Sequence, residues 1–82
     1  MEVDKQEVHV FPNPASNQLK IFCNWDNYQY ELIDNTGRKV LDGNVNNGIK
    51  NITIETANFP SGLYYLNICN KTQRTSEKIL VK

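Results

Sequence analysis

The sequence is poor in the residues from which catalytic and metal sites are usually built. It contains one histidine, His9, and two cysteines, Cys23 and Cys69, which lie far apart along the chain. The close spacing of metal ligands is therefore missing. No nucleophile–base pattern and no phosphate-binding loop occurs, and the carboxylates Asp34 and Asp42 have no evident pocket. The sequence therefore argues against an enzyme, and we expect no cofactor.

Net charge is also absent, because nine basic and nine acidic residues are spread along the chain. A nucleic-acid partner requires a clustered basic surface, and so does an anionic membrane surface. No apolar run approaches the roughly 20 residues of a membrane-spanning helix. We therefore expect no nucleic-acid partner and no stable insertion into a membrane.

The chain is short. Its 82 residues make one domain, and a domain of this size buries only about 60–65 % of its unfolded surface. A deep cavity would cost core that it cannot spare. The first seven residues are charged and lack the apolar segment of a signal peptide. This start fits either a cytoplasmic protein or a piece of a larger one, and the abundance of asparagine between short apolar runs suggests an exported β-protein.

The two cysteines leave two interpretations open. Cys23 and Cys69 can pair in an oxidising compartment, or both can be ordinary buried thiols. The composition favours the thiols.

Helical periodicity is absent, and short alternating or β-branched runs take its place. Proline, glycine and asparagine clusters interrupt them about every 8–12 residues, as in a sandwich or barrel. Two sheets packed face to face are the economical way to bury seven such runs. The expected strands are Val8–Phe11, Gln18–Cys23, Tyr28–Asp34, Arg38–Asp42, Ile49–Glu55, Leu63–Ile68 and Glu77–Lys82.

The segments between the strands have typical turn sequences. Pro12-Asn13-Pro14 predicts a stiff corner, since two prolines remove two backbone donors and force the residue between them to be extended. Gly37 is suited to the positive φ of a hairpin turn. We expect a flexible connection at Gly43–Gly48 and a polar bend at Asn70–Ser76.

Trp25 lies in a loop rich in turn formers and also has two interpretations. It either caps the core or lies on the surface as a platform for a sugar ring. Core capping is favoured for a lone tryptophan in so small a domain. The surface alternative would make the protein a small accessory module that binds carbohydrate or protein, with Tyr28 or Tyr65 beside the indole.

We interpret residues Phe59 to Lys82 as the segment that the rest of the chain presents. Phe59-Pro60-Ser61-Gly62 predicts a turn, and two strands joined by a polar bend follow it to the last residue. Nothing in this segment suggests catalysis, so we interpret it as a feature that a partner recognises.

Four pieces of the sequence together resemble a known family. They are Val10–Pro14, Tyr30–Val40, Phe59–Ile68 and Glu77–Lys82, in this order. The chain resembles, over about residues 8–82, the C-terminal sorting domain of the type IX secretion system of Bacteroidetes. The two cysteines and Phe59, where the family often has leucine, depart from the family pattern.

The resemblance implies a seven-stranded, immunoglobulin-like antiparallel β-sandwich at the end of a larger exported protein. Such a domain directs its cargo from the periplasm through an outer-membrane translocon, together with the shuttle proteins of the system. A gingipain-like surface peptidase or sortase then removes the domain, and the cargo is anchored at the cell surface or released. Residues 1–7 would be the linker or cleavage region after the cargo, and residues 8–82 the sorting domain.

The resemblance also implies which residues carry the sorting motif. They lie at the first corner, in the central hairpin, in the sixth strand and in the last strand. The matching positions are Pro12, Asn13, Pro14, Gly37, Arg38, Gly62, Tyr64, Leu66, Ile68, Lys78 and Lys82.

Structural roles are expected for most of these positions. The glycines suit turn geometry, and Tyr64, Leu66 and Ile68 suit a core. The backbone edge of the last strand and its lysines are the exposed candidates for contact, because an unpaired edge can accept a partner strand. Since the last strands also supply core, we expect a signal that depends on the fold and not a linear tag.

Overall fold

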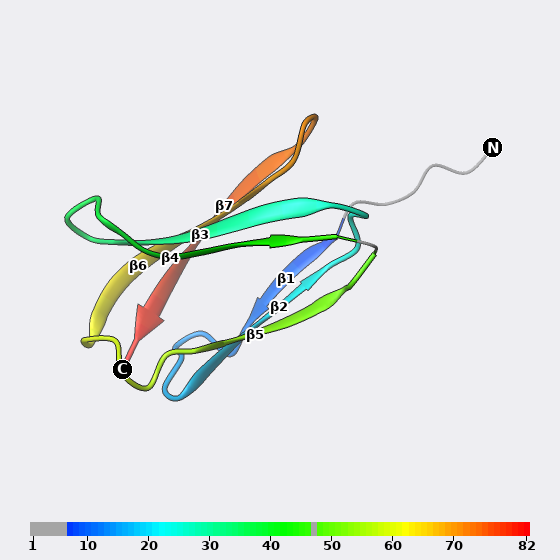
Figure 1. Cartoon of the computed structure of the whole chain (residues 1–82). Coiled ribbons are helices and arrows are strands. Elements are labelled where there is room, and N and C mark those ends of the chain that lie inside the picture. The colour runs from blue at the N-terminus through cyan, green and yellow to red at the C-terminus, as the bar shows by residue number, and fades with distance from the viewer. Residues whose placement is uncertain (1–6, 47) are drawn as a thin grey trace.

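The computed structural model describes residues 7–46 and 48–82 and shows seven strands in two layers (Figure 1). The cleavage region predicted within residues 1–7 lies, apart from Glu7, outside the described residues. The strands are β1 (Val8–Phe11), β2 (Gln18–Cys23), β3 (Tyr28–Asp34), β4 (Lys39–Val45), β5 (Asn51–Glu55), β6 (Gly62–Cys69) and β7 (Arg74–Val81).

The strands form one sheet of three and one of four. The order is β1-β2-β5 in the first sheet and β4-β3-β6-β7 in the second, and all strand pairs within the sheets are antiparallel. The chain changes sheet between β2 and β3, between β4 and β5, and between β5 and β6. The predicted all-β class and the two-sheet arrangement of seven strands are confirmed. Among the described residues, no helix is long and apolar enough to cross a membrane.

The core lies between the two sheets and is built from alternating positions, as the period of two requires. In β2 every second residue from Leu19 is fully or almost fully buried, and the same holds from Tyr64 in β6. The core positions expected in the sixth strand, Tyr64, Leu66 and Ile68, are confirmed. The largest fully buried apolar side chains are Leu19, Ile21, Leu32, Leu66, Ile68, Ile79 and Val81.

Trp25 belongs to this core. Only 7 % of its surface is exposed, and its ring meets that of Tyr28 edge to face at a centroid distance of 6.4 Å. Tyr28 is also buried, with 2 % of its surface exposed, whereas Tyr65 is exposed. The core-capping interpretation of Trp25 is confirmed. The sugar platform is wrong, because a sugar ring needs an exposed aromatic face and the loop after β2 turns this indole inward.

The fourth strand is longer than predicted. Gly43, Asn44 and Val45 continue β4, although their types are typical of a connection. Val45 is buried opposite Tyr28, and the ring of Tyr30 covers Gly43 so closely that a Cβ there would lie 2.5 Å from the tyrosine hydroxyl oxygen. Tertiary packing of two tyrosines against β4 therefore overrides local turn propensity.

The seventh strand begins earlier than predicted, at Arg74. The predicted bend is shorter and ends at Gln73, because the Asn70 side-chain oxygen accepts the N–H groups of Thr72 and Gln73, both at 2.9 Å. The polar residues after it pair with the end of β6, Arg74 with Cys69. A strand at a sheet edge can form by backbone pairing alone while one of its faces contacts solvent. The polar residues at its start are therefore compatible with a strand.

The two cysteines are free thiols. Cys23 lies fully buried on the core face of β2, and burial is the largest cause that raises the pKa of its thiol. Cys69 lies on the other sheet beside Gln29. Of the two interpretations, the structure therefore supports the unpaired thiols.

Candidate functional site

The Pro12-Asn13-Pro14 corner lies against the last strand. Both X-Pro peptide bonds are cis. The Asn13 side chain binds β7 in two places, because its amide nitrogen donates to the carbonyl oxygen of Lys78 at 2.8 Å and its oxygen accepts the N–H of Leu80 at 3.1 Å. A side-chain amide here takes the place of a neighbouring peptide group.

The chain extends this contact beyond the corner. Ala15 is fully buried and forms a parallel bridge with Val81. Its N–H donates to the carbonyl of Leu80, and its own carbonyl accepts the N–H of Lys82, both at 2.8 Å. From Lys78 to Lys82 the outer edge of β7 is therefore covered by the chain itself. The prediction of an open edge is wrong for this half of the strand.

The basic residues of the last strand remain exposed. Lys78 and Lys82 are both exposed, and neither takes part in an ion pair within the described part of the chain. Alternation along β7 puts Lys78 and Leu80 on the outer face of the sheet, while Ile79 and Val81 face the core. Leu80 is 44 % exposed and Tyr65, opposite Lys78, is 38 % exposed. Apolar and cationic groups thus share this outer face.

The β3–β4 turn carries Gly37 and Arg38. Gly37 has a φ of +90°, which confirms the predicted left-handed turn position. The carboxylate oxygen Oδ1 of Asp34 accepts the Thr36 N–H at 2.9 Å, the Thr36 hydroxyl at 2.6 Å and the Arg38 N–H at 3.0 Å. The Arg38 guanidinium lies 3.4 Å from the other carboxylate oxygen and is mostly exposed. Asp34 therefore organises the turn and leaves the arginine accessible.

These contacts affect the charge of the turn. The hydrogen bond from the Thr36 hydroxyl is the largest cause that holds the pKa of Asp34 below its ordinary value, and the Arg38 N–H adds to it. On β4 the carboxylate of Asp42 lies 2.7 Å from the Lys39 ammonium and raises the pKa of that lysine. Asp34 and Asp42 are thus held by separate local partners and do not form a carboxylate pair.

Gly62 opens β6 with a φ of +150°, and a Cβ there would meet nothing within 4 Å. The backbone conformation, and not the close approach of a neighbouring group, therefore accounts for a glycine at this position. Tyr64 is buried, donates its hydroxyl to the Pro60 carbonyl at 2.7 Å and stacks on Phe59 at a centroid distance of 5.9 Å. The Phe59–Gly62 turn is therefore anchored by a core side chain.

All the predicted motif positions except Lys78, which lies within β7, fall into two groups. Tyr64, Leu66 and Ile68 are core residues, at 4 % exposure or less. The corner, the Gly37 turn and Gly62 lie at one end of the sandwich, together with the C-terminus, and we call this the motif end (Figure 1). The start of β1 and the β6–β7 turn lie at the opposite end, the entry end.

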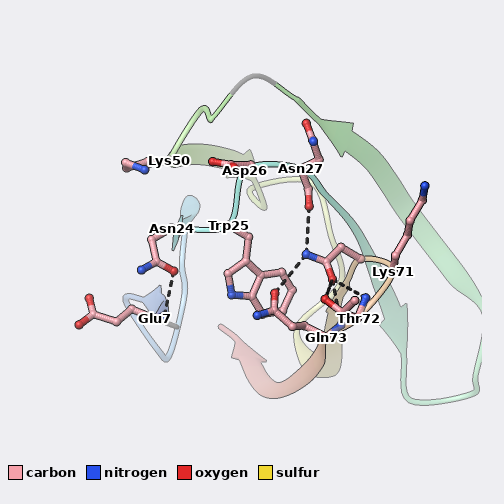
Figure 2. A pocket seen from close by; sticks show the side chains of 10 residues that line it. Glu7, Asn24, Trp25, Asp26, Asn27, Lys50, Lys71, Thr72 and Gln73 are labelled. Carbon is pink, nitrogen blue, oxygen red and sulfur yellow. Dashed lines mark hydrogen bonds between the residues drawn. The ribbon is translucent and has the colours of Figure 1, made fainter. Parts of the chain in front are cut away.

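Two features that matter for contact with a partner were not predicted from the sequence. Ala15 gives no chemical signal, and only its position directly after the Pro-Asn-Pro corner indicates a special role. At the entry end, a hollow of about 870 Å³ lies between the loops after β2 and β6 (Figure 2). Within the described ranges, no group of three or more metal-ligating side chains gathers.

Replacement of Asn13 by alanine tests the edge contact. The Leu80 N–H would lose its acceptor, and we expect its hydrogen exchange to accelerate and unfolding to become easier by about 1 kcal/mol. This corresponds to a melting temperature lower by about 4–8 °C for a domain of this size. Asn17→Ala is the matched control, because the Asn17 side chain makes no hydrogen bond among the described residues. Unchanged Leu80 exchange in Asn13→Ala would show that the amide does not hold the edge.

Acid titration tests the β3–β4 turn. A carboxylate whose pKa is lowered by folding stabilises the protein above its unfolded pKa of about 3.9, and this contribution is lost as pH falls through the lower folded value. The stability difference between the wild type and Asp34→Asn should therefore shrink as the pH falls below about 4. In carbon NMR titrations Thr36→Val should raise the Asp34 pKa more than Arg38→Gln does. The reverse order would contradict the assignment of the main cause.

The comparisons agree with the sequence resemblance. Residues 9–82 match the family model described as the secretion system C-terminal sorting domain. A comparison with curated proteins finds no match. The family match runs from β1 to the last residue and includes both the motif end and the core strands. The chain belongs to the family of type IX secretion C-terminal sorting domains, which are sorting signals and not enzymes.

Proposed function

We propose that residues 8–82 carry an upstream cargo from the periplasm through the outer-membrane translocon, and that the cargo then stays at the cell surface or is released. Shuttle proteins of the system and a gingipain-like surface peptidase or sortase are the partners of this route. Family membership supports the proposal, since a sorting domain implies a secreted protein and contact with secretion machinery.

Residues 1–7 form the linker or cleavage region in this proposal. Glu7 supports this division, because its N–H donates to the Asn24 side chain at 2.9 Å and its carbonyl accepts the Asn24 N–H at 3.2 Å. The folded unit is thus anchored at Glu7, immediately before β1. A peptidase acting upstream of this point would leave the sandwich intact.

We also assign the sandwich to the immunoglobulin-like group. The strand order β1-β2-β5 and β4-β3-β6-β7 supports this assignment, together with three changes of sheet along the chain. The corner after β1 adds support, because it leads the chain from the edge of one sheet to the edge of the other.

The observation that carries the proposal is the contact of Asn13 and Ala15 with β7. It joins the first and last motif segments, which are 65 residues apart at Asn13 and Lys78. In the proposal Pro12, Asn13, Pro14, Gly37 and Gly62 shape the motif end. Tyr64, Leu66 and Ile68 support the motif end from the core. The side chains of Arg38, Lys78 and Lys82 are the groups that a partner contacts.

Export of a fusion protein tests the proposal. A reporter followed by residues 1–82 should leave the cell in a bacterium that has this secretion system, and deletion of β7 should abolish export. Lys78→Glu and Lys82→Glu should reduce export at an unchanged melting temperature, because both side chains are exposed. Lys20→Glu, at an exposed position of β2 on the other sheet, is the matched control.

Two results would count against the proposal. Periplasmic retention of the intact wild-type fusion would reject the function itself. Normal export of both lysine variants would reject their role as contact residues and leave the function standing.

A further inference from the structure

The outer edge of β7 is closed over only half of its length. Backbone groups along an edge strand point alternately toward the neighbouring strand and outward. The outward carbonyl group of Lys78 and both outward groups of Leu80 bind Asn13 and Ala15. By the same alternation, the N–H and C=O groups of Arg74 and Ser76 also point outward, and within the described part of the chain no hydrogen bond reaches them.

This open half borders a hollow of about 490 Å³, which lies between the start of β1 and the start of β7. Its lining consists of Val8, Trp25, Thr72, Gln73, Arg74 and Thr75. It shares Trp25, Thr72 and Gln73 with the larger hollow at the entry end. The unpaired backbone therefore stands beside an accessible space.

Trp25 gives an independent indication of a ligand. Its indole is more than nine-tenths buried, yet Nε1 has no hydrogen-bond partner among the described residues. Figure 2 shows this indole in the middle of the residues that line the larger hollow, between Asn24 and Gln73. A buried donor is usually paired, and Nε1 has almost no surface open to solvent, so an acceptor from another molecule completes the site only when the surrounding side chains move.

The charges beside the open edge favour an acidic ligand. Lys71 is exposed in the β6–β7 turn, and Arg74 and Lys78 are exposed on β7. None of the three forms an ion pair within residues 7–46 and 48–82. The acids nearby are Glu7, which has His9 as a neighbour at 3.9 Å, Asp26, which lines the larger hollow, and Glu77, whose side chain lies on the face of β7 opposite to Arg74 and Lys78.

We propose that the β7 edge from Arg74 to Ser76 accepts an extended acidic segment of a secretion-machinery protein as an added strand. The backbone of that segment pairs with the outward groups of Arg74 and Ser76, and one of its oxygens accepts the Trp25 indole N–H once the side chains that cover Nε1 have moved. Asn13 marks where the added strand ends. This inference rests on the proposed function and names the surface through which a partner reads the domain.

The export assay offers a closely matched pair of variants. Ser76→Ala and Ser76→Pro both remove the hydroxyl that donates to the Asn67 side chain at 2.6 Å. Only the proline variant also removes the outward N–H. Proline is tolerated on an edge strand at positions whose N–H points away from the neighbouring strand. We expect Ser76→Ala to be exported like the wild type and Ser76→Pro to be exported roughly tenfold less, as the loss of a strong hydrogen bond implies.

If Ser76→Pro fails to fold, Arg74→Glu is the alternative variant for the export assay. It reverses the charge beside the edge without changing the backbone, and we expect a similar loss of export. Lys20→Glu is again its control. Normal export of every folded variant at Arg74 and Ser76 would overturn the inference while the secretion function stands. Failure of the wild-type fusion to be exported would instead reject the secretion function.

A binding experiment tests the chemistry directly. The probes are two synthetic peptides, one of alternating valine and glutamate and one of alternating valine and lysine, added to isotope-labelled protein. The glutamate peptide should shift the NMR signals of the Arg74 and Ser76 amides and of the Trp25 indole N–H. The lysine peptide should bind roughly tenfold more weakly, as the loss of one charged hydrogen bond implies.

Three results would overturn the inference. They are no shift of these signals with the glutamate peptide, equal binding of both peptides, and a concentration-dependent shift of the same signals without peptide. The last result would mean that a second copy of this chain occupies the edge.

Discussion

The structure depends on the closure of the last strand by the first corner. A terminal edge strand presents unpaired backbone groups, and such edges invite unwanted pairing. Here Asn13 and Ala15 bind the carbonyl group of Lys78, both backbone groups of Leu80 and the N–H of Lys82. The contact joins the two ends of the domain and ties the three-stranded sheet to the four-stranded one. Predicted motif residues lie on both sides of this contact, so in the proposed function the signal is displayed only when the domain is folded.

This dependence explains why so many motif positions serve geometry. Gly37 and Gly62 hold positive φ angles in open space, Asp34 organises a turn, and Tyr64 anchors the Phe59–Gly62 segment from within the core. An 82-residue domain has little surplus stability. It therefore cannot present a defined surface unless its turns are fixed by specific contacts. In the proposed function, the groups that a partner contacts are the exposed cations and the open half of β7.

Much of the fold could be predicted from the sequence, because alternation and turn residues specify strands directly. Strands β1, β2 and β3 match their predicted bounds, and the core positions predicted in β6 are buried. The ends of β4 and β7 could not be predicted, since Gly43 is fixed by the ring of Tyr30 and Arg74 by backbone pairing to Cys69. The hydrogen bonds of Asn13 to β7 could not be predicted from the sequence either. Its partners are more than 60 residues away in sequence, and local patterns carry no information about them.

The central claim is that the signal is a folded surface, and a core variant tests it most directly. Leu32 is fully buried in β3 and is not one of the motif positions. Leu32→Asp should unfold the domain, because a charge would lie unpaired in the core, while every exposed motif residue stays in the chain. Gln29→Asp, at an exposed position of the same strand, is the control. The account predicts that the Gln29→Asp fusion is exported and the Leu32→Asp fusion is not. Export of an unfolded Leu32→Asp fusion at the wild-type level would contradict the account.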